Sequence, residues 1–169
     1  MTVILRRATA DDLLAVGALH QHSRVATYSS FLPPEALAEP TPEAMGRYWA
    51  ERWVWERDDH LMTVAERDGT LVGFSYVGPD DEGDPATGLL NAIHLDPAER
   101  GRGVGRELMI DALDTMRSRG WRRAVLWVLA QNDSARRFYE RGGWTPTGAK
   151  REDLIGPAVT TQLRYARPL

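Results

Sequence analysis

One stretch of the chain, residues 89–106, constrains the fold more than any other. Within it an apolar run is followed by a segment with proline and glycines and then by the start of an amphipathic segment. An apolar run from Leu89 to Leu95 is followed by Pro97 and then by three glycines. Proline cannot donate to a β-ladder and pushes the preceding residue towards extended geometry, so the apolar run predicts a buried strand that ends there. From Val104 onward, apolar residues recur at helical spacing between charged ones. The stretch therefore predicts a strand, a glycine turn and an amphipathic helix.

The glycine turn is suited to hold phosphate. Glycines at a helix start leave the backbone N–H groups uncovered, and the helix dipole adds partial positive charge at that end. The spacing fits neither common phosphate motif, because the dinucleotide pattern needs glycine where Arg106 stands and the P-loop needs a lysine that the turn lacks. We expect phosphate affinity to be local, around Arg100, Arg102 and Arg106.

A second block, residues 124–144, repeats the order of strand and helix. It opens with an apolar run, and Asp133 or Ser134 is expected to cap the helix that follows. Gly142 and Gly143 are expected to end that helix in a left-handed cap. The two blocks together predict a strand-helix-strand-helix unit with two parallel strands.

The remaining segments predict antiparallel structure around this unit. We expect strands at residues 3–8, 61–65, 71–77, 144–154 and 158–166, helices from Thr9 or Asp11 to His20 and at 42–56, and a long apolar loop from Ser23 to Pro42. Asp68-Gly69 between two of these strands is a strong signal for a tight hairpin. The order βααβββαβαββ predicts a mixed α/β fold in a single domain over residues 1–169.

Composition argues against several other classes of protein. A net charge of −3 over 169 residues argues against sequence-independent nucleic-acid binding, which needs a basic face. The absence of cysteine leaves no disulfide, thiolate nucleophile or cysteine metal cluster. No apolar run reaches the roughly 18 residues of a membrane span, and the first residues lack a signal-peptide layout. We expect a cytoplasmic protein with no nucleic acid, membrane or metal as partner.

The two blocks resemble the two signature motifs of the general N-acetyltransferase (GNAT) superfamily, R/Q-x-x-G-x-G/A and N-x-x-A-x-x-x-Y-x-x-x-G-[FW]. The matching residues are Arg100, Gly103 and Gly105 in the first motif and Asn132, Ala135, Tyr139, Gly143 and Trp144 in the second. The resemblance implies a GNAT-like fold whose parallel central strands splay apart around the pantetheine arm of coenzyme A. It also implies transfer of an acetyl group from acetyl-CoA to an amine of a small molecule or peptide, by direct attack in a ternary complex.

The resemblance further implies roles for individual residues. Tyr139 would protonate the departing thiolate, with packing as its structural alternative. The backbone of Ile93 and Leu95 would pair with pantetheine, and the Leu95 N–H would polarise the thioester carbonyl. The implied coenzyme-binding residues are Ile93, His94, Leu95, Arg100, Gly101, Arg102, Gly103, Val104, Gly105, Arg106, Asn132 and Tyr139.

The general base is where the sequence departs from the family pattern. Family members place a glutamate at one of two positions, which are held here by Leu89 and Trp127. Titratable residues that remain near the expected site are His94, Asp96, His20 and His22. No base is therefore assigned.

The acceptor is also left open by the sequence. Trp49, Trp53 and Trp55 form either core packing or an aromatic wall of an acceptor pocket. A non-catalytic module that binds or senses acyl-CoA is the alternative to an enzyme, and association into a homodimer is a further hypothesis.

Overall fold

The computed structural model describes residues 2–169. The strands are β1 (Ile4–Arg7), β2 (Leu61–Arg67), β3 (Thr70–Pro79), β4 (Thr87–Leu95), β5 (Arg123–Leu129), β6 (Thr145–Ile155) and β7 (Ala158–Pro168). The helices are α1 (Leu13–Tyr28), α2 (Pro34–Leu37), α3 (Pro42–Glu56), α4 (Val104–Ser118) and α5 (Asp133–Arg141), with the 3-10 turns η1 (Ala10–Asp12) and η2 (Pro97–Glu99).

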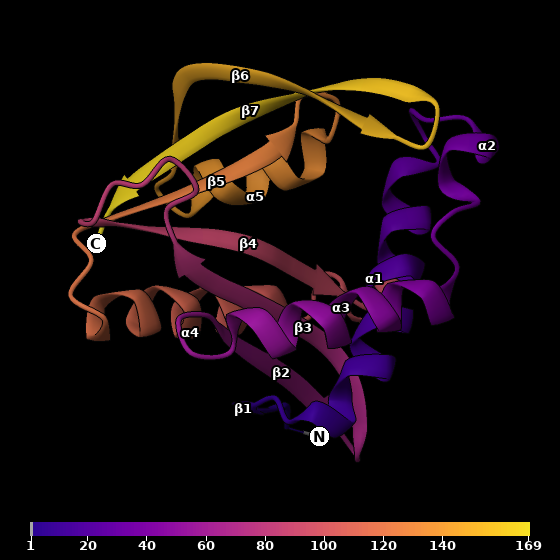
Figure 1. Cartoon of the computed structure of the whole chain (residues 1–169), viewed down its shortest axis with the longest axis horizontal. Helices are drawn as coiled ribbons and strands as arrows, with labels where there is room; N and C mark the ends of the chain where they lie inside the picture. Colours follow the sequence, from indigo (N-terminus) through magenta and orange to yellow (C-terminus); the bar gives the residue numbers. More distant parts are fainter. Residues whose placement is uncertain (1) are drawn as a thin grey trace.

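The seven strands form one sheet in the order β1-β2-β3-β4-β5-β7-β6 (Figure 1). All neighbouring pairs are antiparallel except β4 and β5, which are parallel and connected through α4. A parallel pair needs such a crossover, because a tight turn can join only antiparallel strands. The predicted mixed α/β fold with a parallel central pair is confirmed.

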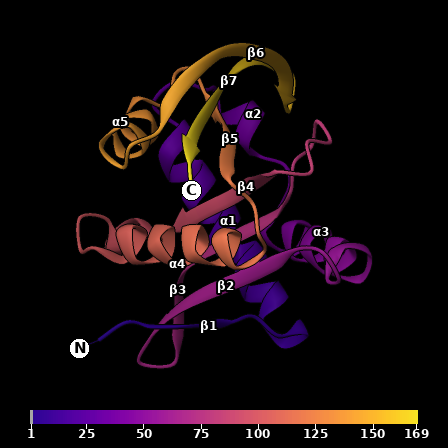
Figure 2. The same ribbon diagram turned by 90° about the vertical axis from the view of Figure 1, so that its left-hand side faces the viewer.

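Helices cover both faces of the half-sheet formed by β1 to β4 (Figure 2). On one face, Val64 and Phe74 pack in a buried cluster with side chains of α1 and α3. On the other face, Ala65 packs in a cluster with Leu108 of α4. Because neighbouring residues of a strand point to opposite faces, this alternation explains why β2 and β3 are apolar on both sides.

The second half-sheet, β5 to β7, carries α5. Tyr139 of α5 packs with Leu126, Trp144 and Tyr165 in a cluster that also includes side chains of α4. The β6–β7 hairpin extends beyond this core, and its turn meets α2, where a Cβ on Gly156 would lie 3.0 Å from Ala36. Figure 1 shows this meeting of hairpin and α2 on the right. The two halves therefore contact each other through the β4–β5 pairing, through the packing of α4 with α5, and at α2.

The long loop expected from Ser23 to Pro42 is only partly a loop, so this prediction was wrong. Helix α1 continues to Tyr28, and α2 forms inside the expected loop. The apolar periodicity fails where Gln21, Ser23 and Arg24 are polar and yet buried. The helix itself does not end there.

The predicted hairpin is confirmed, since Asp68 and Gly69 join β2 and β3 with φ values of 53° and 77°. Two positive φ values are what a tight type I′ turn requires. Among residues 2–169, no helix is both long enough and apolar enough to cross a membrane.

Candidate active site

A cleft of about 730 Å³ opens where β4 and β5 separate. The two strands pair only from Thr87–Arg123 to Leu90–Leu126, although both continue further. The pairing of β4 with β3 skips Asn91, which makes this residue a β-bulge. A bulge bends its strand, so β4 turns away from β5 at the residue after their last pair. The backbone edge of β4 beyond Leu90 is thereby left facing the cleft.

The glycine turn between β4 and α4 borders this cleft. Gly101 and Gly103 have φ values of 75° and 86°, a conformation that favours glycine. Gly103 is the N-cap of α4 and has no side chain that could accept a hydrogen bond. The first backbone N–H groups of the helix are therefore not capped by this residue. Gly105 packs so closely that an added Cβ would lie 3.3 Å from Leu95 and 3.6 Å from Phe138.

Only some of the side chains at the glycine turn face the cleft. Arg100 and Arg106 line the cleft, whereas Arg102 does not and lies 3.8 Å from Glu99. Val104 is buried in the core, so only its backbone is available to a ligand. Arg100 is held towards α1 by a hydrogen bond from its Nη2 to the Thr27 hydroxyl.

Asp96 supports the turn rather than facing the cleft. Its carboxylate accepts a hydrogen bond of 2.9 Å from the Ala98 N–H and so caps η2. It is not among the cleft-lining residues. Glu99, at the end of η2, is buried and pairs with Arg67 of β2 at 2.9 Å. These contacts fix the start of the glycine turn against the sheet.

Tyr139 lines the cleft from α5. The residue is 9% exposed, and its ring packs edge-on against Trp144. Burial, together with the nearby Tyr28, raises the pKa of the Tyr139 hydroxyl. Among residues 2–169 this hydroxyl has no hydrogen-bond partner. It therefore keeps its proton at neutral pH and is free to donate it to a group in the cleft.

Asn132 also lines the cleft and caps α5. Its Oδ1 accepts a hydrogen bond of 3.2 Å from the Ala135 N–H. The prediction that Asp133 or Ser134 would cap this helix was wrong by one or two residues. The predicted left-handed end of α5 is confirmed at Gly143, whose φ is 87°.

Two of the four candidate basic or acidic residues come together in the cleft. The rings of His20 and His94 lie 4.2 Å apart, whereas His22 is exposed and outside the cleft. Burial, with the charges of Arg100 and Arg24, lowers the pKa of His94 to about 4. Burial also lowers the pKa of His20, whose Nδ1 accepts a hydrogen bond of 3.0 Å from the Trp49 indole. Both rings are therefore neutral at pH 7.

The two positions where family members carry glutamate hold no proton acceptor here. Leu89 is buried against Val125 and Ala166. Trp127 lines the cleft and donates a hydrogen bond of 3.0 Å from its indole to Asp81. The guanidinium of Arg151 stacks on the Trp127 ring at 4.2 Å and pairs with the same Asp81 at 3.1 Å.

The three tryptophans of α3 have different positions. Trp49 is 2% exposed and belongs to the core, and it also lines the cleft, so its role in an acceptor pocket stays a prediction. Trp53 packs partly buried against the core, and Trp55 is 81% exposed. Tyr48 and Arg52, one residue before Trp49 and three after it, also line the cleft.

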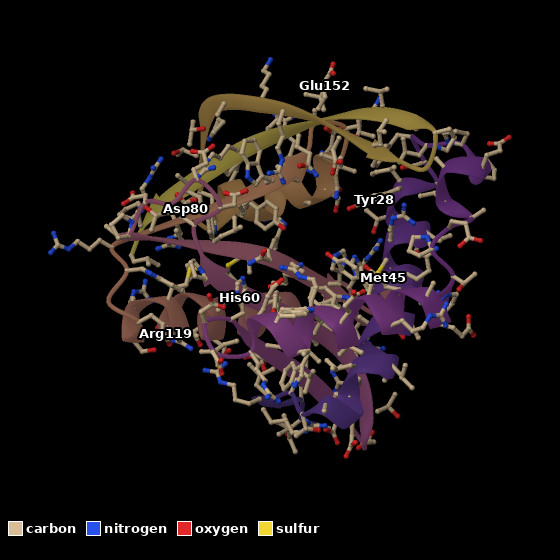
Figure 3. All side chains as sticks on the ribbon, in the orientation of Figure 1. Tyr28, Met45, His60, Asp80, Arg119 and Glu152 are labelled. Atoms are coloured by element: carbon tan, nitrogen blue, oxygen red, sulfur yellow. The ribbon has the colours of Figure 1, made fainter. Side chains whose placement is uncertain are left out.

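Several polar residues line the cleft that were not expected from the sequence, above all Arg24 and Tyr28 of α1 and Arg52 of α3. Figure 3 shows Tyr28 on α1 where this helix faces the β6–β7 hairpin. A signal was present in the sequence, since His20, Arg24 and Tyr28 recur every four residues and so share one helix face.

The model of the acetyltransferase (GNAT) family matches residues 24–144. A mycothiol acetyltransferase from Thermobispora bispora is 37% identical over 108 residues, covering 62% of this chain and 36% of that protein. One from Beutenbergia cavernae is 46% identical over 79 residues, covering 47% of this chain and 26% of that protein. The chain thus spans less than half the length of these curated relatives.

Solved structures share the fold over the whole chain. The PaiA N-acetyltransferase from Thermoplasma acidophilum, in complex with coenzyme A, superimposes with a TM-score of 0.83 at 20% identity and full coverage of both chains. The ribosomal-protein-S18-alanine N-acetyltransferase from Escherichia coli gives a TM-score of 0.70 at 19% identity, covering 99% of this chain and 94% of that one.

Proposed function

Because the chain belongs to the acetyltransferase (GNAT) family, we propose that it transfers the acetyl group of acetyl-CoA to an amine of a small molecule or peptide, by direct attack in a ternary complex. The observation that carries the proposal is the unpaired edge of β4 beside the glycine turn, with the free hydroxyl of Tyr139 across the cleft. The relatives named as acetyltransferases, and the coenzyme A bound in a structure of this fold, support the same donor.

The residues present fit the parts of acetyl-CoA. The edge of β4 from Asn91 to Leu95 would pair with the amide groups of pantetheine, as an added strand would. The N–H groups of residues 101–106 would hold the pyrophosphate, with Arg100 and Arg106 adding charge. An added Cβ on Gly103 would meet no atom within 4 Å, so the space above the turn is open to the ligand.

Acetyl-CoA supplies a thioester whose carbonyl the amine attacks and whose thiolate then departs. We propose that a backbone N–H of β4, at Leu95 or close to it, donates to the carbonyl oxygen as negative charge develops there. One such donor contributes roughly 3 kcal/mol in other enzymes. Tyr139 would give its proton to the thiolate, a role that its raised pKa and unpartnered hydroxyl support.

Deprotonation of the amine is proposed to need no dominant side-chain base. His94 has a pKa of about 4 and is a weak base, and Asp96 lies outside the cleft. The Ser23 hydroxyl lies 3.3 Å from Nδ1 of His94, so this pair can pass a proton onward without holding it. The amine would therefore lose its proton to water, directly or along this path.

Coenzyme binding by the Gly103→Asp variant tests the proposal. The substitution puts a carboxylate where the pyrophosphate would lie, so we expect the rise in Tm with acetyl-CoA to disappear. Gly148→Asp is the matched control, since Gly148 also has a positive φ of 91° and open space around it but does not line the cleft. Equal binding of acetyl-CoA by both variants would show that the pyrophosphate lies elsewhere.

Thiol release from acetyl-CoA with a panel of amines separates the enzyme from a non-catalytic acyl-CoA sensor. An enzyme releases free thiol with at least one amine, and a sensor binds the coenzyme without release. The unpartnered hydroxyl of Tyr139 favours the enzyme. Size-exclusion chromatography tests the homodimer, and fractionation of cells tests the cytoplasmic location; both stay predictions.

A further inference from the structure

One buried cation of the cleft has no counterion. Four charged residues are buried among residues 2–169, namely Arg24, Asp80, Glu99 and Arg164. Asp80 and Arg164 pair with each other at 2.7 Å, and Glu99 pairs with Arg67 at 2.9 Å. Arg24 is 9% exposed and pairs with no carboxylate of the described chain.

The partners of Arg24 are neutral oxygens. Its Nη1 donates to the side-chain oxygen of Gln21 and to the carbonyl of Glu39, both at 3.1 Å, and its Nη2 donates to the carbonyl of Ala36 at 3.5 Å. Burial lowers the pKa of the guanidinium. A buried cation without a counterion is costly, and an anion bound beside it would offset that cost.

The free donors of Arg24 suit a carboxylate. Its Nε–H and one N–H of Nη2 have no partner among the described residues. The nitrogens Nε and Nη2 share one edge of the guanidinium plane. That edge matches the two oxygens of a carboxylate in a bidentate hydrogen-bonded pair.

Arg24 lies on the part of the cleft wall that surrounds the reacting centre. It lies between His20 and Tyr28 on one face of α1, at spacings of four residues. His20 contacts His94, and Tyr28 is close enough to Tyr139 to raise the pKa of that hydroxyl. The glycine turn has its own arginines for the coenzyme phosphates, which leaves Arg24 available to an anionic group of the second substrate.

The rest of the cleft disfavours a cationic acceptor. Only one carboxylate, that of Asp153, lines the cleft among the described residues. Six arginines line it: Arg24, Arg52, Arg100, Arg106, Arg141 and Arg151. Two of them are paired, Arg52 with Glu56 at 2.6 Å and Arg151 with Asp81 at 3.1 Å. Of the other four, Arg100 and Arg106 lie at the glycine turn and Arg141 lies at the end of α5, whereas Arg24 lies beside His20 and Tyr28 on α1.

We propose that Arg24 binds a carboxylate of the amine acceptor, so that the acceptor is an amino acid or another amine with a carboxylate close to its nitrogen. This inference rests on the proposed acetyl transfer and names the substrate class of the same site. The bidentate pair would hold the carboxylate on α1 and direct the neighbouring amine towards the thioester beside Tyr139.

Binding of the reaction products tests the inference without interference from the pKa of the amine. Calorimetry would compare N-acetyl amino acids with their primary amides, which differ only in the negative charge, on protein saturated with coenzyme A. We expect at least one acid to bind at least about tenfold more tightly than its amide, as a charge-assisted pair provides. Arg24→Gln should remove this preference, and Arg24→Lys should keep part of it.

Arg47→Gln is the matched control, because Arg47 is exposed on α3 and outside the cleft, and it should keep the full preference. Circular dichroism would establish that each variant is folded. Equal binding of acids and amides, no binding of any acid, or tighter binding of a polyamine would overturn the inference.

Two further outcomes separate this inference from the proposed function. If Arg24→Gln weakened coenzyme A binding and left the acid preference intact, Arg24 would belong to the coenzyme site and the inference would be wrong. If acids bound through Arg24 but no amine gave thiol release, the acetyl transfer would be wrong and the anion site would stand alone.

Discussion

The pH dependence of kcat/KM with two acceptors of different basicity is the sharpest test of how the amine loses its proton. The two acceptors both keep a free carboxylate for Arg24: a short peptide, whose α-amine has a pKa of about 7.8, and lysine with its α-amine blocked, whose side-chain amine has a pKa of about 10.4. At pH 7, roughly one peptide amine in seven is neutral, against roughly one lysine amine in 2,500. Without a dominant base, kcat/KM should therefore rise tenfold per pH unit up to the pKa of the acceptor itself.

Neither His94 nor Tyr139 is expected to add a limb to this profile between pH 6 and 10. The pKa of His94 is about 4, so its imidazole stays neutral over that range. The pKa of Tyr139 is raised above its usual value of about 10, so the proposed acid keeps its proton. The rising limb should then move by about 2.6 pH units when one acceptor replaces the other.

The lower end of the profile is set by stability. The folded pKa of His94 is about 4, against about 6.5 in the unfolded chain, so the unfolded state binds more protons between these values. The free energy of unfolding is therefore unaffected by His94 above pH 6.5 and decreases as the pH falls towards 4. The decrease from this one residue is at most roughly 3 kcal/mol. The profile should begin at pH 6.

The assay is release of free thiol from acetyl-CoA at saturating coenzyme, for the unmodified protein and His94→Asn. We expect the same limb, displaced with the acceptor, in both proteins. A limb fixed near pH 6 to 7 for both acceptors that vanishes in His94→Asn would refute the reasoning and identify His94 as the base.

The remaining predictions concern α5. Tyr139→Phe should lower kcat on the order of a hundredfold or more and leave the Kd of coenzyme A unchanged in calorimetry, since the hydroxyl has no partner in the protein; an unchanged kcat would leave Tyr139 a packing role only. Asn132→Ala should lower the free energy of unfolding in urea by about 1 kcal/mol through loss of the cap. Ser134→Ala should leave stability unchanged, and an equal loss there would contradict the capping assignment.

Local signals in the sequence were enough for the elements next to the glycines. Helix α4 starts at Val104 because Gly103 can take the left-handed conformation before it, and the β2–β3 hairpin turns at Asp68-Gly69 for the same reason. These elements depend on few residues that are adjacent in the chain. Their positions could therefore be predicted without knowledge of the packing.

Helix α1 shows why the rest could not be predicted. The rule that a helix carries an apolar stripe assumes that its buried face meets a hydrophobic core. From Gln21 to Tyr28 the buried face of α1 meets the cleft and α2 instead, so its buried residues are polar. The rule then predicts an end to the helix where there is none. Such failures are expected at functional sites, where local rules are broken for a ligand.

The candidate site depended on pairings between distant parts of the chain. The roles of the glycine turn and Tyr139 followed from motifs, but nothing in the sequence shows that His20 meets His94 or that Asp81 engages Trp127. The sequence also could not predict that Arg24 lacks a counterion, because this depends on the positions of all its neighbours in the folded chain.

The two walls of the cleft, the half-sheet β1 to β4 with its helices and the half-sheet β5 to β7 with α5, contact each other at both ends of the cleft. At one end β4 and β5 pair from Thr87 to Leu90 before the bulge separates them. At the other end the turn of the β6–β7 hairpin packs on α2, where Ile155 and Ala158 contact a small buried cluster around Ala36. With the walls held in this way, the edge of β4 beyond Leu90 has no strand partner and Arg24 has no counterion. Both are left for ligands to satisfy, so the protein should gain stability from each substrate separately.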